Sequence, residues 1–162
     1  MRKTDTNIYF WGSHYSQWFK QNNLIEEDGI FYNSAEKYMM VKKAELFGDI
    51  EIKNQMLQSN DPKKVKSLGR KISNFNDKKW NENKVKIVTQ GNYLKFSQNK
   101  KLLDILLEDK KYILVEASPV DKIWGVGLHY EDDKILKESN WRGENLLGIS
   151  IMAAREQILN NL

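Results

Sequence analysis

The chain of 162 residues contains no cysteine, only two prolines and only two histidines. Without cysteine, disulfide frameworks, thiolate zinc sites, iron–sulfur clusters and cysteine nucleophiles are excluded. The histidines, His14 and His129, do not stand at ligand spacing, so a zinc site or a Ser-His-Asp arrangement has little support. Glycine-rich phosphate loops and dinucleotide fingerprints are absent as well. Several common kinds of active site are thereby removed from consideration.

Long apolar runs are also missing. No segment approaches the roughly 20 apolar residues of a membrane span, and the first residues lack the apolar core of a signal peptide. Nothing in the composition argues for an oxidising compartment. We therefore expect a cytoplasmic protein that does not bind membranes. The length predicts one domain over residues 1–162, burying roughly two-thirds of its unfolded surface.

The net charge of +4 is distributed unevenly along the chain. Residues 1–59 hold 7 basic and 8 acidic side chains, residues 60–101 hold 12 and 3, and residues 102–162 hold 7 and 11. The strongly basic middle segment indicates an anionic partner, with a solvated lysine-rich helical surface as the alternative. Lysine outnumbers arginine 22 to 4. The few arginines, Arg70, Arg142 and Arg155 among them, are candidates for bidentate phosphate recognition.

Apolar spacing and capping residues predict a mainly helical chain with short strands. Short strands are expected at 8–11, 29–32 and 112–117, and helices at about 33–47, 49–59, 61–72, 77–97, 102–107 and 144–160. Asn33 is the expected N-cap of the first helix, with Glu36 at the third position, and Gly91 is a candidate break in the long helix. The predicted fold class is mainly α at the α+β border.

The first motif with possible chemistry lies in the helix that starts near Asn33. Glu36, Met40 and Lys43 are spaced by four and three residues, which places them on one face, and a ligand could lie between the carboxylate and the ammonium. The alternative is that Glu36 closes a capping box and Lys43 is an exposed lysine.

A second motif follows the apolar strand that ends at Glu116. The following loop holds Asp121, Trp124, Gly125 and Gly127, so a carboxylate could be held beside an aromatic face while backbone approaches a ligand closely. The alternative is that Trp124 belongs to the core and the glycines serve turns.

A third motif precedes the last helix. The free amides at the start of that helix could bind an anion, with Asn145 and Arg155 on a face that also carries Gly148 and Met152. Alternatively, Asn145 is an N-cap and Gly148 a helix-packing contact.

Four segments together resemble the NADAR, or YbiA-like, family of N-glycosidases. They are Asn33 to Ala44 (NSAEKYMMVKKA), Leu68 to Arg70 (LGR), Glu116 to Leu128 (EASPVDKIWGVGL) and Trp141 to Gly148 (WRGENLLG). The resemblance runs in order over nearly the whole chain, from Phe10 and Trp11 to Met152 and Arg155. It implies a mainly helical fold and hydrolysis of the bond between a ribose and a base. The substrate classes it implies are phosphoribosylamino-pyrimidine intermediates of riboflavin synthesis and ADP-ribose attached to guanine, with nucleic acid as a candidate substrate.

The resemblance also implies roles for individual residues. Catalysis would fall to Glu36 as first choice, Asp121 as second, and Lys43 as a phosphate contact, a proton donor or a Schiff-base amine. Trp124 would stack on the base, and Arg70 and Arg155 would bind phosphate. The full expected substrate-binding set is Trp11, Tyr38, Arg70, Trp124, Gly125, Asn145 and Arg155. No metal or cofactor is required.

Two other functions fit the sequence. The basic middle segment and five tryptophans could serve a reader of ADP-ribose or nucleic acid that has no catalytic activity. An inactive relative that acts as a partner in a toxin or defence system is the other alternative. Glu36, Lys43, Asp121 and Trp124 are all present, which counts against it.

Overall fold

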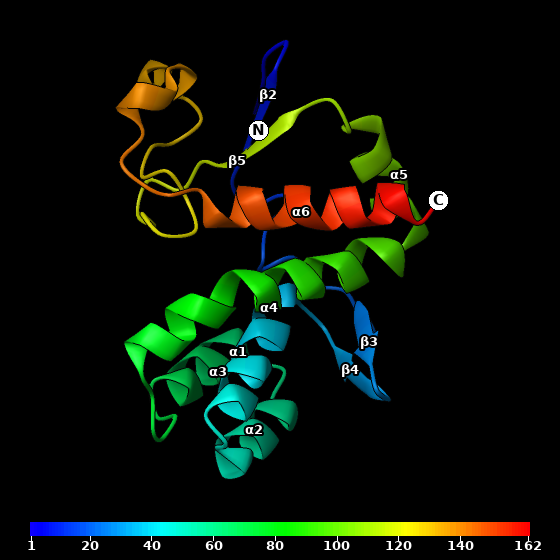
Figure 1. Cartoon of the computed structure of the whole chain (residues 1–162), viewed down its shortest axis with the longest axis vertical. Coiled ribbons are helices and arrows are strands. Elements are labelled where there is room, and N and C mark those ends of the chain that lie inside the picture. Colours follow the sequence, from blue (N-terminus) through cyan, green and yellow to red (C-terminus); the bar gives the residue numbers. More distant parts are fainter.

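A computed structural model describes residues 1–162 and shows a mainly helical protein with a small sheet at one end (Figure 1). The helices are α1 (Ala35–Leu46), α2 (Ile50–Leu57), α3 (Pro62–Gly69), α4 (Asp77–Ser97), α5 (Lys100–Glu108) and α6 (Leu146–Asn160). The strands are β1 (Arg2–Lys3), β2 (Asn7–Phe10), β3 (Ile25–Glu27), β4 (Ile30–Tyr32) and β5 (Ile113–Glu116), and two 3-10 turns span Asp133–Leu136 and Glu138–Asn140. The expected class, mainly α with short strands, is confirmed.

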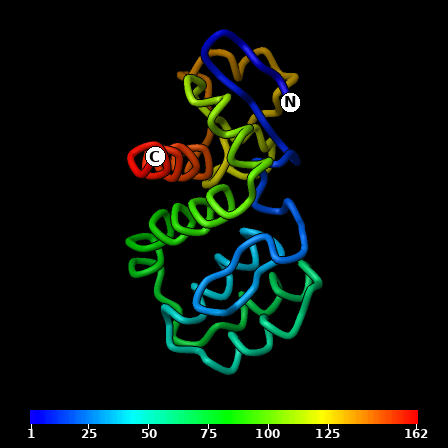
Figure 2. The backbone as a smooth tube through the Cα atoms, turned by 90° about the vertical axis from the view of Figure 1, so that its right-hand side faces the viewer, coloured from blue at the N-terminus to red at the C-terminus, as the bar shows by residue number.

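The sheet joins parts of the chain that are far apart in sequence. Its order is β1-β2-β5, with β2 parallel to β5, so that Phe10 lies opposite Glu116. A parallel pair needs a long crossover, and here the crossover comprises the β3–β4 hairpin and helices α1 to α5. Helix α6 packs between β5 and α4, and α1 packs against α4 on the far side, as Figures 1 and 2 show.

Strand alternation sorts the side chains of the sheet into two cores. Ile8, Phe10 and Leu114 join the main core of the helices, whereas Tyr9 and Val115 join a smaller cluster on the other face. Because side chains alternate along a strand, Glu116 lies on the same face as Leu114. The apolar pattern of β5 therefore directs a carboxyl group toward the helices.

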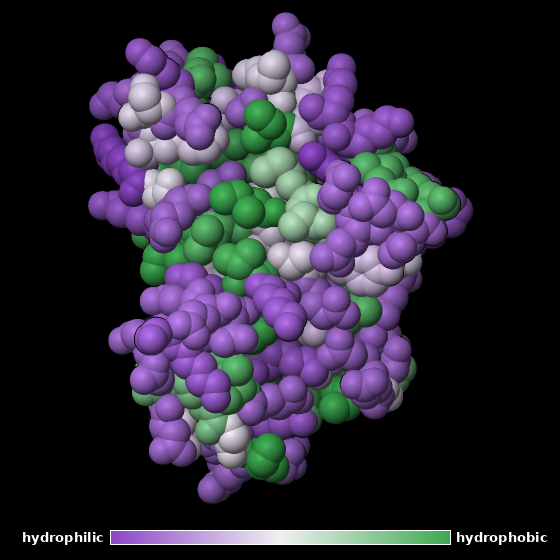
Figure 3. Space-filling view, viewed as in Figure 1, coloured by the Kyte–Doolittle hydropathy of each residue, from purple (hydrophilic) through white to green (hydrophobic).

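Apolar side chains also reach the surface. The exposed apolar residues of α6 and β5 include Ile149 and Ile113, and Figure 3 shows apolar side chains gathered around α6 in the middle of this face. None of the helices combines the length and apolar composition needed to cross a bilayer.

Strands β3 and β4 form a tight hairpin. Strand β3 was not predicted from the sequence. Asp28 and Gly29 form a two-residue loop with φ of 54° and 81°. Positive φ at both positions is the type I′ geometry that Asp-Gly favours in hairpins. The dipeptide was thus a usable signal for the missed strand.

Three helix starts differ from prediction, and α5 begins at Lys100 instead of residue 102. The N-cap of α1 is Ser34 instead of Asn33, because the Ser34 hydroxyl accepts the Lys37 N–H at 3.1 Å, while the Asn33 carbonyl accepts the Gln21 N–H. Glu36 therefore does not stand at the third position and closes no capping box. Helix α6 starts at Leu146 instead of Glu144, because the backbone of Asn145 is left-handed, with φ of 54°.

Gly91 does not break α4, which runs unbroken from Asp77 to Ser97. A Cβ atom at Gly91 would lie 2.7 Å from Cδ1 of Tyr38 on α1, closer than such atoms approach. Because glycine has no Cβ atom, the Tyr38 ring of α1 can pack directly against α4 at this position.

We expect Gly91→Ala to destabilise the protein by about 1–2 kcal/mol, although alanine is ordinarily the better helix former by about 1 kcal/mol. The Tyr38 ring cannot move freely because its hydroxyl donates to the Glu27 carboxylate at 3.0 Å. Urea unfolding would measure the change, with the exposed Glu82→Ala on the same helix as control. A Gly91→Ala protein as stable as the wild type would contradict this account of the packing.

Candidate active site

Three carboxyl groups meet in a small cleft of about 60 Å³ between the sheet and the helices. The lining comes from the loop after β2, the start of α1, the end of β5 with its following loop, and the start of α6. The lining residues are Ser16, Gln17, Trp18, Glu36, Met39, Glu116, Asp121, Trp124 and Leu147. We call it the carboxylate cleft. Of the residues expected at the site, the structure brings Glu36, Asp121 and Trp124 together here.

Glu36 stands in the first turn of α1, where its backbone N–H donates to the Gln17 carbonyl at 2.9 Å. Burial raises the pKa of its carboxyl to about 7; the positive charge of Lys66 opposes the rise, Asp121 adds to it, and Lys43 opposes it. A carboxyl group that titrates near neutral pH can both accept and donate a proton. Strongly shifted carboxyl groups in clefts are typical of active sites.

Glu116 ends β5 and is only 8% exposed. Its backbone N–H donates to Oδ1 of Asn145 at 2.9 Å, and its carbonyl accepts the Val126 N–H at 3.0 Å. Burial raises the pKa of the Glu116 carboxyl to about 8, Asp121 adds to the rise and Lys95 opposes it. At neutral pH burial therefore favours the protonated form of this carboxyl.

The loop after β5 folds back on itself to hold Asp121 and Trp124 at the cleft. Oδ1 of Asp121 accepts the N–H groups of Ile123 and Trp124, each at 2.9 Å. A Cβ atom at Gly125 would lie 2.9 Å from the Asp121 carbonyl oxygen and 3.0 Å from that of Glu116. Gly125 is buried and shapes this loop; it does not line the cleft.

Lys43 lies two turns along α1 from Glu36, outside the cleft lining. Its ammonium is 4.8 Å from the ring centroid of Phe75 and 5.1 Å from that of Trp80. Burial lowers the pKa of this amine, although the charges of Glu36 and Asp77 partly offset the effect. The Lys43 ammonium therefore loses its proton more readily than that of an exposed lysine, and its charge acts on Glu36 in the cleft.

Asn145 and Arg155 bind protein groups instead of facing the cleft. The Asn145 side chain bridges two backbone groups of β5, accepting from the Glu116 N–H and donating to the Leu114 carbonyl at 3.0 Å. Arg155 donates to the Asp109 carbonyl at 3.0 Å. The Leu147 N–H at the start of α6 donates to the Trp124 carbonyl at 3.1 Å. The anion site expected at this helix start is thus occupied by the protein's own backbone.

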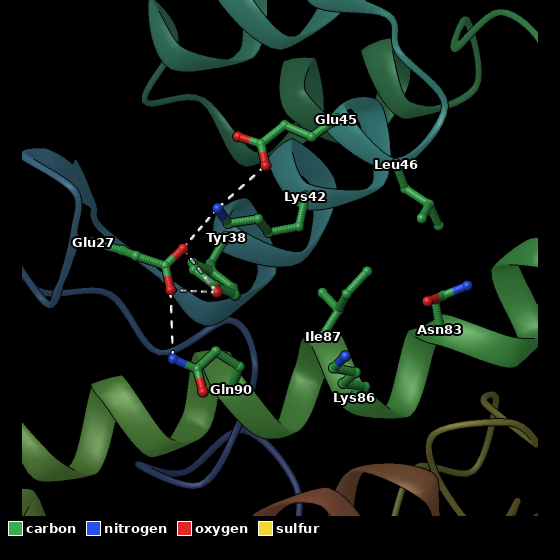
Figure 4. A pocket seen from close by; sticks show the side chains of 9 residues that line it. All are labelled: Glu27, Tyr38, Lys42, Glu45, Leu46, Asn83, Lys86, Ile87 and Gln90. Atoms are coloured by element: carbon green, nitrogen blue, oxygen red, sulfur yellow. Dashed lines mark hydrogen bonds and ion pairs between the residues drawn. The ribbon is translucent and has the colours of Figure 1, made fainter.

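Tyr38, Trp11 and Arg70 also lie outside the cleft lining. The Tyr38 hydroxyl donates to Glu27 in a second, larger pocket, shown in Figure 4. Trp11 is 44% exposed and stands edge-on to His129. Arg70 caps the end of α3 and its exposed side chain has no hydrogen-bond or ion-pair partner.

Several lining residues escaped the sequence analysis. Glu116 carried a usable signal, a charge that ends an apolar strand. Gln17 and Trp18 lie in an irregular loop and carried none. Lys66, on α3, lies 5.9 Å from the Trp18 ring centroid and affects the pKa of Glu36. No group of three or more histidine, aspartate or glutamate side chains is arranged to hold a metal ion.

Comparison with known proteins assigns this chain to a family. The model of the NADAR domain matches residues 2–159. The chain belongs to the NADAR family. An N-glycosidase of Acanthamoeba polyphaga mimivirus is 43% identical over 96% of this chain and 98% of its own length. Protein irg-1 of Caenorhabditis elegans is 40% identical over 86% of this chain and 67% of its own length.

A solved structure supports the same assignment. The NMR structure of Escherichia coli YbiA matches with a TM-score of 0.77 at 25% identity, over 99% of this chain and 89% of that one. YbiA too is named an N-glycosidase. The enzyme class named for the mimivirus protein and for YbiA is the one that the family resemblance of the sequence implied.

We expect Glu36→Gln to stabilise the protein at neutral and alkaline pH. Because the folded state raises the pKa of Glu36 from 4.5 to about 7, it holds this proton more tightly than the unfolded chain does. The wild type therefore loses stability as the pH rises between those values, and the glutamine variant does not. The gain should be absent below about pH 4.5 and reach about 1–3 kcal/mol above about pH 7.

Urea unfolding at about pH 4 and about pH 8 measures this difference. The exposed Glu131→Gln is the matched control and should show no such pH dependence. If the Glu36→Gln protein and the wild type were equally stable at the higher pH, ionisation of Glu36 in the folded protein would not lower the free energy of unfolding, and the prediction would be wrong.

Proposed function

We propose that this protein hydrolyses the N-glycosidic bond between the ribose and the base of a phosphorylated ribosyl compound. The enzyme class, a hydrolase of N-glycosyl bonds, follows from its family and from relatives that are named N-glycosidases. The observation that carries the proposal is the Glu36 carboxyl, with a pKa near 7, in a cleft that also holds Asp121 and Trp124. The proposed substrates are phosphoribosylamino-pyrimidines and ADP-ribosyl-guanine.

The reaction breaks the bond from C1′ to the base nitrogen while C1′ develops oxocarbenium character. Water supplies a hydroxyl to C1′ and a proton to the departing nitrogen, so the reaction consumes no other proton. Ionised Glu36 orients the water and accepts its proton, which then passes from the Glu36 carboxyl to the departing nitrogen. The nearby Asp121 carboxylate stabilises the positive charge at C1′. Trp124 offers its ring to the base at the same cleft.

The basic groups near the cleft supply the phosphate contacts. Lys43 and Lys66 both act electrostatically on Glu36, and they belong to separate helices, α1 and α3. We assign phosphate binding to these two lysines, because the Arg155 guanidinium donates to the Asp109 carbonyl. Arg70, whose exposed side chain has no partner in the protein, remains a proposed phosphate contact.

The first test supplies both substrate classes to the purified protein. Released base and sugar are followed by liquid chromatography and mass spectrometry with a phosphoribosylamino-pyrimidine and with DNA that carries ADP-ribosyl-guanine. Glu36→Gln should reduce turnover of the accepted substrate by at least about 100-fold, the lower end of a general acid–base contribution. Because the variant should be at least as stable as the wild type, lost activity cannot be attributed to unfolding.

Wild-type turnover by Glu36→Gln would refute the role of Glu36. Cleavage of neither compound by the wild-type protein would refute the proposed function for both substrate classes.

Lys43 offers a second chemical route, because an amine with a lowered pKa can condense with the aldehyde of an opened ribose and release water. We expect cyanoborohydride to reduce this imine during turnover and to add the mass of the sugar to a peptide containing Lys43. Lys42→Arg is the control for specificity, since Lys42 is paired with Glu27 at 2.6 Å. Turnover without any labelled Lys43 would leave this residue as a phosphate contact only.

A binding module without catalysis is the second candidate, favoured by the excess of basic residues in 60–101. Its affinity for nucleic acid should fall steeply with salt, through counterion release. Hydrolysis of a small ribosyl phosphate should show a shallow dependence.

A further inference from the structure

Two buried polar side chains line the carboxylate cleft, and each has one buried atom without a hydrogen-bond partner: Nε2 of Gln17 and Oε2 of Glu116. Gln17 and Glu116 are 7% and 8% exposed, whereas Trp18 on the same cleft is 43% exposed. Buried polar groups are nearly always hydrogen-bonded. Unpartnered groups that line a cleft therefore indicate where a ligand supplies the missing partners.

The amide of Gln17 is oriented by a fixed neighbour. Oε1 of Gln17 accepts from Nδ2 of Asn92 at 2.9 Å, and the same Nδ2 donates to the Val88 carbonyl at 2.9 Å. Asn92 is fully buried in α4, so this arrangement is rigid. Gln17 is left with its Nε2 buried and without a partner. The cleft is thereby given a hydrogen-bond donor.

The carboxyl of Glu116 provides the complementary group. Its Oε2 is buried without a partner, and no protein group donates to either of its oxygens. Its backbone is held on both sides, by Asn145 and by Val126. Lys95, the nearby buried cation, donates to the Ser16 carbonyl at 3.0 Å and makes no hydrogen bond to Glu116. The backbone of Glu116 is therefore held in place, while its carboxyl is free to bind a ligand.

The remaining walls suit a flat ring. Trp18, Met39, Trp124 and Leu147 supply apolar surface around the two polar groups. A volume of about 60 Å³ accepts the edge of a heterocycle and excludes a whole nucleoside. A base inserted edge first would leave its ribose toward the more exposed part of the cleft, where Glu36 and Asp121 lie.

We propose that Gln17 and Glu116 form a specificity subsite for the lactam edge of a pyrimidinone ring. The ring N–H donates to the Glu116 carboxyl, and the adjacent ring carbonyl accepts from the Gln17 amide. Both proposed substrate classes contain this edge, in guanine and in the aminopyrimidinone. The assignment rests on the proposed function and adds the feature of the base that is read.

The test compares each substrate with its lactim methyl ether, in which the oxygen carries a methyl group and the ring nitrogen has lost its hydrogen. Wild-type kcat/KM should fall at least about tenfold for the ether, because a site built to hydrogen-bond a group rejects the analogue that lacks it. This comparison needs no variant, so it does not depend on how a substitution affects folding. The comparison is made twice, once with the aminopyrimidinone substrate and its ether and once with ADP-ribosyl-guanine and its ether. The two results show which of the two bases the subsite binds.

Two variants then locate the recognition. Glu116→Leu and Gln17→Glu should bring the ratio of the two kcat/KM values close to one, the first by removing the acceptor and the second by opposing the ring carbonyl with another acceptor. Glu116→Gln keeps an acceptor beside a donor and should retain the preference. The exposed Glu131→Gln is the control and should leave the ratio unchanged.

The outcomes separate this inference from the function on which it rests. Equal cleavage of lactam and ether by the wild type overturns the subsite and leaves the hydrolase standing. A preference that survives both Glu116→Leu and Gln17→Glu also overturns it. Release of no base from either lactam refutes the proposed function itself.

Discussion

The side chain of Asn145 holds the two halves of the site together. With its backbone in the left-handed conformation, it ends the loop before α6, and its amide pairs with the Leu114 carbonyl and the Glu116 N–H of β5. A Cβ atom at Gly148 would clash with the Leu114 carbonyl oxygen, so α6 can approach the strand only with glycine at that position. This contact sets the places of Glu116 and Leu147. Because backbone hydrogen bonds from 142–147 to 122–126 continue it, Trp124 is fixed by the same constraint.

This arrangement buries ionisable side chains, which lowers the stability of the fold. Glu36 and Glu116 have raised pKa values, and burial lowers the pKa of Lys95, which is wholly enclosed, to about 7. Isolated buried charges are strongly unfavourable, so such groups become neutral near physiological pH or require partners. A fold selected for stability alone would place apolar side chains at these positions. The same unfavourable burial brings two carboxyl groups into the pH range in which they can exchange protons and donate or accept hydrogen bonds.

Local signals carried much of the fold and part of the site. The start of α2 after Asp49, the start of α3 at Pro62 and both ends of α4 agree with the helix ranges predicted from the sequence. Glu36 and Lys43 share the expected helix face because that depends only on spacing. The failures depend on tertiary contacts: Gly91 resembles a break until the Tyr38 ring is placed against it, and Asn145 and Arg155 resemble ligand residues until β5 and Asp109 accept their hydrogen bonds. The orientation of the Gln17 amide depends on a hydrogen bond from Asn92, 75 positions away in the sequence, so it could not be predicted from local spacing.

Cavities larger than the carboxylate cleft lie elsewhere in the molecule, one of about 480 Å³ beside Trp141 and Ile149 and another beside Tyr38. The pocket beside Tyr38, shown in Figure 4, has a volume of about 420 Å³, several times that of the carboxylate cleft. Its polar groups already bind one another: Glu27 accepts from Tyr38 and pairs with Lys42, which also pairs with Glu45. A ligand would have to break these contacts to make its own. In the carboxylate cleft the buried Nε2 of Gln17 and Oε2 of Glu116 have no such partners. A ligand that supplies them gains hydrogen bonds without displacing any protein group, so the carboxylate cleft favours binding despite its small volume.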